Sequence, residues 1–468
     1  MFKNSFQLKS QLMFKNDCEF QAAKADFILE CADEFQKNFN WEGINLRPSF
    51  NRYIQVLLYS HLVKKDWFQK KLASKESVQD ILSDIEQFPK TWKSKLMEVP
   101  GLQYTKHKFQ WLSYNSKKIT KNKPLIAVHH WKFVNYLKKS KLFDELNPLW
   151  LVENPRMAKE MGLNEDDLII PLIKPFQSSK SRFPINKLKD LTNGLKLSLL
   201  RSRPSAIFVL EGDAAYHTLL AEIGRMLDIP VYCFQWGCFH HDKLRTAFSE
   251  MQFTKFLSWG PIFEDQLKPF NPQQDFISFG NLLSNSSPRR GNKIIFLGQN
   301  IVDEITKADQ NIFVKLANSL AERFPDQVVW RPHPKYEAGN KELLDSKSSK
   351  VKLLNPRESL SSQLQDSVVA VSISSSSLID ALYFGVIPIN FNTTCMKSYP
   401  FPFVKQGVGF EFRSFDHALE QITDLLNNKN KISNIQKKIA TNYNAYFSNT
   451  EFTQKKNYIN IFCKNNLI

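Results

Sequence analysis

Short apolar runs of strand length alternate with helical stretches from about residue 124 onward. The runs that we predict as strands are 124–128, 150–152, 168–170, 206–210, 231–234, 293–297, 327–330, 367–371 and 386–391. The clearest helical stretches among them are 214–227, 311–323 and 378–383. Apolar runs without a polar face indicate strands that are buried on both sides, as in a parallel sheet. The pattern therefore predicts an α/β protein built from βαβ units.

One polar, turn-rich stretch interrupts this rhythm. Residues 285–292 contain asparagine, serine, proline, arginine and glycine but no apolar run, as a linker between domains does. We therefore predict a first Rossmann-like lobe at 121–284 and a second one at 292–440. Helical spacing ahead of them predicts a helical region at 1–120 that packs on the first lobe, and we expect a C-terminal helix at 441–468.

Composition supports a folded protein with more than one core. At 468 residues the chain is long for a single domain, and its 42% apolar content with 38 phenylalanines argues against global disorder. No window of about 18 uninterrupted apolar residues predicts a transmembrane helix, and the first residues do not resemble a signal peptide. We therefore expect the protein in the cytoplasm.

Cysteines and histidines do not suggest a metal site. The cysteines lie at positions 18, 31, 233, 238, 395 and 463 and form no C-x-x-C pair. His217, His240 and His241 lie near acidic residues, but their spacing fits no common ligand pattern. We therefore expect reduced thiols, mostly in the core, and neither a metal nor another cofactor.

The formal net charge of +17 leaves three explanations open. Solvated surface lysines, attraction to an anionic membrane surface and attraction of anionic substrates all fit this charge. Nucleic-acid binding is not expected, because no helix-turn-helix, zinc-finger or aromatic-basic sheet signature is present.

The predicted strand at 327–330 leads into a short basic segment with a histidine held between two prolines. Its residues are Arg331, Pro332, His333, Pro334 and Lys335. The prolines restrict the backbone on both sides of the histidine, so the imidazole can be presented at a fixed point. There it can hydrogen-bond a phosphate oxygen and stabilise a leaving group, with Arg331 and Lys335 adding positive charge. The alternative is a turn with a buried histidine whose hydrogen bonds are satisfied.

A row of four serines follows the predicted strand at 367–371. They are Ser374, Ser375, Ser376 and Ser377. Capping of the next helix needs one of them, and the other hydroxyls let a phosphate approach the backbone N–H groups at the helix start. Asp380 can accept hydrogen bonds from ribose hydroxyls, or it only stabilises the first helical turn. Together with the His-Pro segment, the serines predict a nucleotide-sugar site and hence a glycosyltransferase.

Acidic residues mark the first lobe. Glu211, Gly212 and Asp213 follow the buried run at 206–210. Two carboxylates at a strand end can supply a general base for an acceptor hydroxyl, and the glycine allows a substrate to approach. The alternative is a turn in which Asp213 caps the next helix. Further donor-side candidates follow two other strands: Gln235, Gly237, Gly298 and Gln299.

These motifs resemble those of a known enzyme group. Glu211-Gly212, His333-Pro334 and the serine row are similar to the acidic-glycine, His-Pro and serine motifs of bacterial sialyltransferases and polysialyltransferases. The resemblance implies the GT-B fold, with two Rossmann-like domains facing a cleft and CMP-sialic acid held by the second domain. It implies Glu211 or Asp213 as the base, His333 on the donor phosphate, and the serines on the phosphate and cytidine of CMP. Leu210 stands where the family usually has a first acid, which leaves the choice of base open.

The resemblance extends to capsule-polysaccharide transferases, and in part to CDP-glycerol glycerophosphotransferases. It implies a metal-independent enzyme that moves a nonulosonic acid (sialic, legionaminic, pseudaminic or Kdo type) from a CMP donor to a glycan of a bacterial capsule or lipopolysaccharide. A lipid-linked acceptor would bring the enzyme to the inner face of the cytoplasmic membrane. Two alternatives stay open: a CDP-glycerol-type polyol-phosphate transferase, and a non-catalytic sugar-nucleotide-binding assembly protein. The region 1–120 either shapes the acceptor side or forms an extra structural layer.

Overall fold

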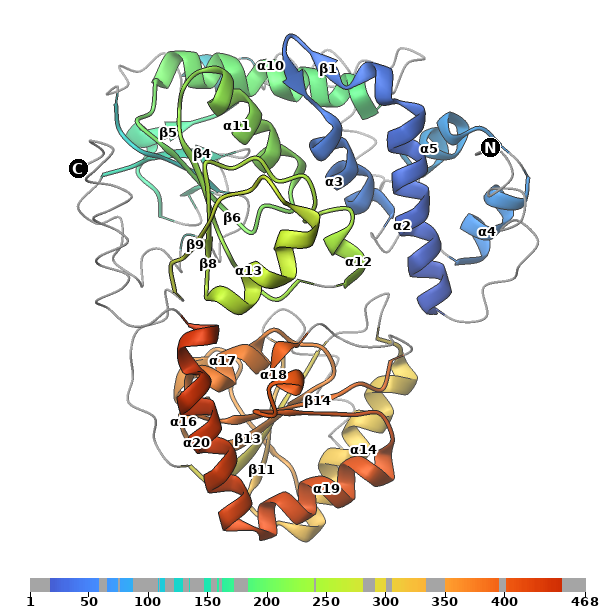
Figure 1. Ribbon diagram of the computed structural model, residues 1–468, viewed down its shortest axis with the longest axis vertical. Helices are drawn as coiled ribbons and strands as arrows, with labels where there is room; N and C mark the ends of the chain where they lie inside the picture. The colour runs from blue at the N-terminus through green and yellow to red at the C-terminus, as the bar shows by residue number, and fades with distance from the viewer. Residues whose placement is uncertain are drawn as a thin grey trace. The chain divides into compact units, whose positions relative to one another are not determined.

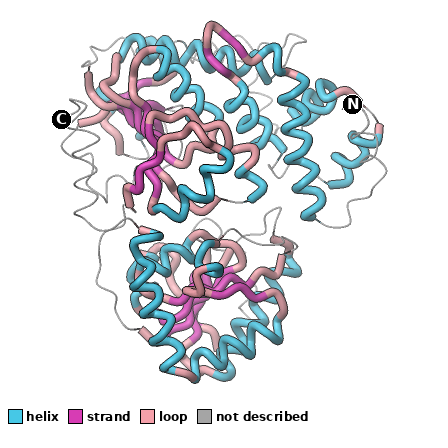
Figure 2. Tube along the Cα trace, viewed as in Figure 1, coloured by secondary structure: helices cyan, strands magenta, loops and turns pink. Residues whose placement is uncertain are grey.

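The computed structural model describes residues 17–58, 65–74, 76–86, 108, 110–113, 122–128, 134, 147–152, 158–159, 162–171, 184–239, 241–280, 291–299, 305–333, 350–394 and 401–447. The chain divides into two compact units between Ser284 and Asn285, which we call the first and second lobes (Figure 1). Helices and strands alternate in both (Figure 2).

The first lobe contains a seven-stranded parallel sheet in the order β5-β4-β3-β6-β7-β8-β9. Its strands are β3 (Leu125–Val128), β4 (Leu149–Val152), β5 (Leu168–Ile169), β6 (Ile207–Leu210), β7 (Val231–Phe234), β8 (Lys255–Ser258) and β9 (Phe276–Ser278). Its helices are α10 (Pro184–Ser202), α11 (Ala215–Met226), α12 (His241–Leu244) and α13 (Pro261–Leu267). Four strands of this sheet, β3, β5, β6 and β7, are buried along their whole length, as expected for parallel strands.

The second lobe contains a six-stranded parallel sheet in the order β12-β11-β10-β13-β14-β15. Its strands are β10 (Lys293–Leu297), β11 (Val328–Arg331), β12 (Lys352–Leu353), β13 (Ser367–Ser372), β14 (Ile387–Phe391) and β15 (Phe410–Phe412). Its helices are α14 (Lys307–Arg323), α16 (Leu360–Gln365), α17 (Ser377–Tyr383), α18 (Pro402–Lys405), α19 (Phe415–Asn427) and α20 (Lys429–Tyr446). Helix α14 packs against α19, and α17 packs against α20 (Figure 1).

Each sheet reverses its direction of winding once. In the first lobe the chain runs outward from β3 through β4 and β5, and then returns to place β6 on the other side of β3. In the second lobe β10 is the starting strand and β13 is the strand placed on its other side. Ligands of such sheets bind outside the carboxyl ends of the strands at this switch point. The switch points therefore lie between β3 and β6, and between β10 and β13.

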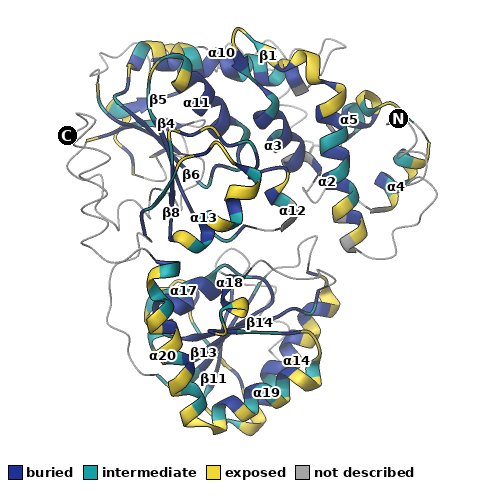
Figure 3. Ribbon diagram, viewed as in Figure 1, coloured by how far each residue is buried: buried dark blue, intermediate teal, exposed yellow. Residues whose placement is uncertain are grey.

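Aromatic residues fill the core of each lobe. In the first lobe, the ring of Phe208 stacks on Tyr232 with ring centroids 5.3 Å apart. In the second, Phe296 stacks on Trp330 at 6.0 Å, and Phe313 lies 5.1 Å from the same indole. Burying each such side chain stabilises the fold by about 1.5–3 kcal/mol. Figure 3 shows the strands of both sheets as buried and the outer helix faces as exposed.

The N-terminal region is helical and packs on the first lobe. Its elements are α2 (Asp17–Glu34), η1 (Gln36–Asn38), β1 (Asn40–Trp41), β2 (Ile44–Asn45), α3 (Arg47–Leu58), α4 (Lys65–Ala73) and α5 (Val78–Glu86). Helix α3 packs against both α10 and α11. The Ser49 and Thr218 hydroxyls share a buried hydrogen bond of 2.6 Å across the contact between α3 and α11.

Most predicted elements match the structure, and the differences have local causes. The 19-residue helix α10 was not predicted. Strands β12 and β15 escaped prediction because they are only two and three residues long. The last described helix, α20, begins at Lys429 rather than in the predicted segment 441–468, and residues 448–468 lie outside the described part. In the portion of the chain that the structure describes, none of the helices has the length and apolarity needed to cross a bilayer.

Candidate functional site

The acidic loop, residues 211–213, follows β6 at the switch point of the first lobe. Its first two residues are left-handed, with φ of 72° at Glu211 and 79° at Gly212. A Cβ on Gly212 would lie 3.0 Å from the Cys233 sulfur and 3.1 Å from the Phe253 ring, so only glycine fits here. Glu211 has a Cβ and is strained by about 1–2 kcal/mol. Such strain persists only where surrounding contacts impose it, and it is concentrated at functional sites.

Three hydrogen bonds hold this loop. The backbone N–H of Glu211 donates to the Phe234 carbonyl at 2.7 Å, and that of Gly212 donates to the Leu210 carbonyl at 2.9 Å. The third comes from the N-terminal region, because Nε of Arg52 in α3 donates to the Gly212 carbonyl at 2.8 Å. Gly212 is buried, whereas Glu211 and Asp213 are partly exposed. The two carboxylates predicted as base candidates therefore flank a buried, tightly held peptide.

Gln235 and Gly237, predicted as donor ligands, belong to the internal bonding of the first lobe. Gln235 is 1% exposed. Its Oε1 accepts from the Trp259 backbone N–H at 2.8 Å, and its Nε2 donates to the Gly237 carbonyl at 3.0 Å. The Trp259 indole N–H donates back to the Gln235 carbonyl at 3.0 Å. These contacts tie together the segments that follow β7 and β8, and they engage both ends of the Gln235 amide.

The serine loop, residues 372–377, follows β13 at the switch point of the second lobe. Gln299, which follows β10, organises it through both ends of its side-chain amide. Oε1 accepts from the Ser374 backbone N–H at 2.7 Å and from the Ser372 hydroxyl at 3.0 Å. Nε2 donates to the Ser374 hydroxyl at 2.9 Å. The structure therefore brings together two segments that the sequence separates by more than 70 residues.

The later serines are more accessible. Ser374 is buried, whereas Ser375, Ser376 and Ser377 are half-buried. Ser376 is the N-cap residue of α17, but its side chain makes no capping hydrogen bond. The Ser375 hydroxyl accepts from the Ser377 backbone N–H at 3.2 Å. Asp380 lies in the first turn of α17 and is half-buried. The loop therefore presents neutral hydroxyls at its surface, with one carboxylate close by.

Arg331 is placed differently from its predicted role as a donor ligand. It is 8% exposed, and its Nη2 donates to the carbonyls of Pro356 and Glu358 at 3.0 and 3.1 Å. Its Nη1 donates to the side-chain oxygen of Gln363. Burial lowers the pKa of this guanidinium, and the charge of Glu358 opposes the shift. Arg331 is therefore a structural cross-link of the segment before β13.

His333 is half-buried and follows β11, the neighbour of β10. Pro334 and Lys335, predicted beside it, lie outside the described residues, as does His240. Gly298 allows close packing of β10 on β11, because a Cβ there would lie 2.8 Å from the indole nitrogen of Trp330. His217 is buried within α11. The described residues include no group of three or more His, Cys, Asp or Glu side chains suited to a metal ion.

Sequence reasoning missed two residues that organise these loops, Arg52 and Asn390. Asn390 lies on β14, and its Nδ2 donates to the Ile373 carbonyl beneath the serine loop. A polar residue inside an apolar strand is a detectable signal for Asn390. Arg52 carries no such signal, since an arginine on a surface helix looks the same in sequence.

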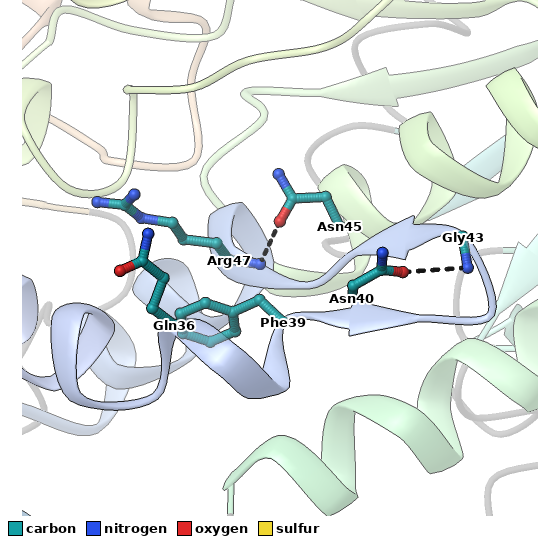
Figure 4. Close-up of a pocket in the computed structure, with 6 residues that line it drawn as sticks. All are labelled: Gln36, Phe39, Asn40, Gly43, Asn45 and Arg47. Carbon is teal, nitrogen blue, oxygen red and sulfur yellow. Dashed lines mark hydrogen bonds between the residues drawn. The ribbon is translucent and has the colours of Figure 1, made fainter.

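A separate hollow lies in the N-terminal region, between η1 and the β1–β2 hairpin (Figure 4). It is lined by Gln36, Phe39, Asn40, Gly43, Asn45 and Arg47. The Asn40 and Asn45 side-chain oxygens accept from the backbone N–H groups of Gly43 and Arg47, which shapes the hairpin. No residue of the acidic or serine loop lines this hollow.

Two solved structures resemble this chain. One is a UDP-N-acetylglucosamine 2-epimerase from Listeria monocytogenes, with a TM-score of 0.51 and 14% identity over 74% of this chain and 97% of that one. The other is S. aureus MnaA in complex with UDP, with a TM-score of 0.50 and 13% identity over 75% of this chain and 98% of that one. The fold is of the GT-B type. No protein-family model and no curated protein matches the sequence.

The GT-B architecture confirms the predicted pair of Rossmann-like lobes with an additional N-terminal helical region. It supports the predicted family only at the level of the GT-B superfamily, because neither of the two matched structures is a sialyltransferase. At 13–14% identity, these likenesses establish the fold alone.

Proposed function

We propose that this protein is a glycosyltransferase that uses a nucleotide-activated sugar. One observation carries the proposal: in each lobe, a loop of reactive or hydrogen-bonding residues lies at the switch point of the sheet. The acidic loop follows β6 in the first lobe, and the serine loop with Gln299 follows β13 and β10 in the second. Switch points are where open α/β sheets bind their ligands.

The two loops offer complementary chemistry. A carboxylate of the acidic loop, Glu211 or Asp213, would accept the proton of the acceptor hydroxyl. Hydroxyls of Ser375, Ser376 and Ser377 would donate hydrogen bonds to the donor phosphate. His333 would stabilise the negative charge that develops on the leaving nucleotide. Asp380 would accept from the ribose hydroxyls. In this scheme neutral and imidazole donors replace a divalent cation, so we expect turnover without added metal.

The donor nucleotide is a pyrimidine nucleotide in this proposal. The motif resemblance favours a CMP-activated nonulosonic acid, whereas the GT-B protein MnaA, which shares the fold, was solved with UDP. A UDP-sugar is therefore the first alternative donor, and CDP-glycerol is the second. The acceptor would be a glycan of the bacterial surface. If it is lipid-linked, the net charge of +17 would favour work at the anionic inner face of the membrane.

A screen of CMP-, CDP-, UDP- and GDP-linked donors tests the proposal. We expect pyrimidine nucleotides to raise the melting temperature and one pyrimidine-linked donor to be hydrolysed or transferred without added metal. His333→Ala should lower turnover by about 2.7–4 kcal/mol in activation free energy while the protein stays folded. Unchanged turnover in that variant would remove His333 from the mechanism. Binding without turnover of any donor would favour a non-catalytic assembly protein.

A second candidate is an epimerase that acts on a UDP-sugar. Both solved structures reported above favour it, since the Listeria protein is described as such an enzyme and MnaA contains UDP. The distinction rests on the acceptor. An epimerase converts its UDP-sugar with no added glycan, whereas a transferase releases nucleotide faster when an acceptor is present. Nuclear magnetic resonance of the sugar product separates the two.

A further inference from the structure

Arg52 connects the N-terminal helical region to the acidic loop. It lies in α3 and is completely buried. Its guanidinium donates to three carbonyl oxygens: Nε to Gly212 at 2.8 Å, Nη1 to Pro48 at 2.9 Å and Nη2 to Ser249 at 3.1 Å. The planar, rigid fork of an arginine suits such a set of fixed acceptors, whereas a lysine ammonium cannot reproduce it.

The buried charge of Arg52 is balanced mainly by distant acids rather than by a bonded carboxylate. Burial lowers the pKa of Arg52 to about 10, and the negative charges of Asp213 and Glu250 oppose this shift. The guanidinium therefore stays protonated at neutral pH. It stabilises both the backbone and the charge of the acidic loop, because one of its N–H groups reaches the carbonyl between the two acidic residues.

The acidic loop needs such a support. Its two left-handed residues lie outside β6 and before the first turn of α11, so helix and strand bonding do not fix their conformation. Turning the Gly212 peptide would re-aim both flanking carboxylates at once. The Arg52 contact is the one hydrogen bond printed in the loop geometry above that holds this carbonyl.

We propose that Arg52 is a positioning residue for the acidic loop, and that α3 is thereby a working part of the first lobe rather than an extra layer. This inference rests on the proposed function, in which a carboxylate of that loop is the base. Misplacing a base by about 1 Å can lower a rate about 100-fold.

The test compares Arg52→Met and Arg52→Lys with Ser49→Ala. Ser49→Ala removes the buried hydrogen bond between α3 and α11 without touching the acidic loop, so it controls for weaker docking of α3. We expect Arg52→Met to lower kcat about 100-fold, while the donor KM and nucleotide Kd change by less than about twofold. Arg52→Lys should recover part of the loss, and Ser49→Ala should keep the kcat of the unmodified protein.

A second measurement does not need turnover. Hydrogen exchange of a peptide spanning residues 210–214 should become faster in Arg52→Lys and stay unchanged in Ser49→Ala. If the unmodified protein transfers no sugar, the proposed function fails and the exchange result alone decides the inference. Folded Arg52→Met and Arg52→Lys proteins with normal kcat, or normal exchange in Arg52→Lys, would overturn it. Arg52→Lys serves in place of Arg52→Met should the latter not fold.

Discussion

The acidic loop and the serine loop occupy equivalent places in two lobes of the same topology, yet they are built in opposite ways. The acidic loop depends on two left-handed residues and on a buried arginine from a helix outside the Rossmann core. In the serine loop, no residue from Ser372 to Ser377 has positive φ. That loop is held instead by neutral amides of neighbouring strands, those of Gln299 and Asn390.

The difference follows from the chemistry proposed for each loop. A base must be aimed at one proton, and carboxylates repel each other, so a charged and rigid support is useful. A phosphate is already charged and accepts hydrogen bonds from many directions, so hydroxyls on an unstrained loop suffice. Four substitutions test this comparison, in order of the effect expected.

Gly212→Ala should have the largest effect. The new Cβ would strain a residue at φ 79° and press on Cys233 and Phe253, so the acidic loop must shift. We expect kcat to fall about 100-fold, with the nucleotide Kd unchanged. Gly43→Ala is a matched control, because Gly43 has φ 81° but nothing within 4 Å of its added Cβ. Equal losses in both variants, measured as kcat and melting temperature, would show that backbone strain alone explains the result.

Arg331→Met should lower stability rather than binding. It leaves the carbonyls of Pro356 and Glu358 and the Gln363 amide without their buried donor. We expect about 2 kcal/mol less unfolding free energy for the second lobe, since each lost partner of a buried group costs about 1–3 kcal/mol. Urea denaturation followed by a probe in the second lobe measures this. A large loss of nucleotide affinity at full folding would restore Arg331 as a donor ligand.

Gln299→Ala should weaken nucleotide binding about tenfold, or about 1.4 kcal/mol, because the serine loop loses three side-chain hydrogen bonds. Gln235→Ala removes a comparably bonded glutamine from the first lobe. We expect it to lower the melting temperature and to leave the nucleotide Kd unchanged. Titration calorimetry with CMP and UDP checks both. A weaker Kd in Gln235→Ala would support the donor-ligand role that the sequence predicts for it.

The smallest effect on activity is expected from thiol alkylation. Burial raises the pKa of Cys233 well above its usual value, although Arg52 lowers it in part. A raised pKa leaves less of the reactive thiolate at any given pH, so alkylation of Cys233 should be slow below that pKa and rise only as pH approaches it. Cys238, five residues on, is partly exposed and should react first at pH 8. Mass spectrometry of the labelled peptides gives both rates, and faster labelling of Cys233 would contradict its burial.

The architecture was predictable because it depends on local patterns. Apolar runs of four to six residues gave the positions of β3, β6, β7, β10, β13 and β14 to within a residue or two. The turn-rich stretch at 285–292 indicated two lobes, and the chain divides at Ser284. Helix α10 was missed, and the start of α14 was placed four residues late, at 311 rather than Lys307, although Thr306 and Asp309 form a capping box there.

Residue type and position at a strand end determined which loops to suspect, and sequence alone reached that point. Only the tertiary structure decided what each polar group contacts. It assigned Gln235 and Arg331 to internal bonding, joined Gln299 to Ser374, and placed Arg52 under Gly212. The physical reason is that strand and helix patterns repeat every two to four residues, whereas a side chain's partner depends on how distant segments pack. The partner of Arg52 lies 160 residues away.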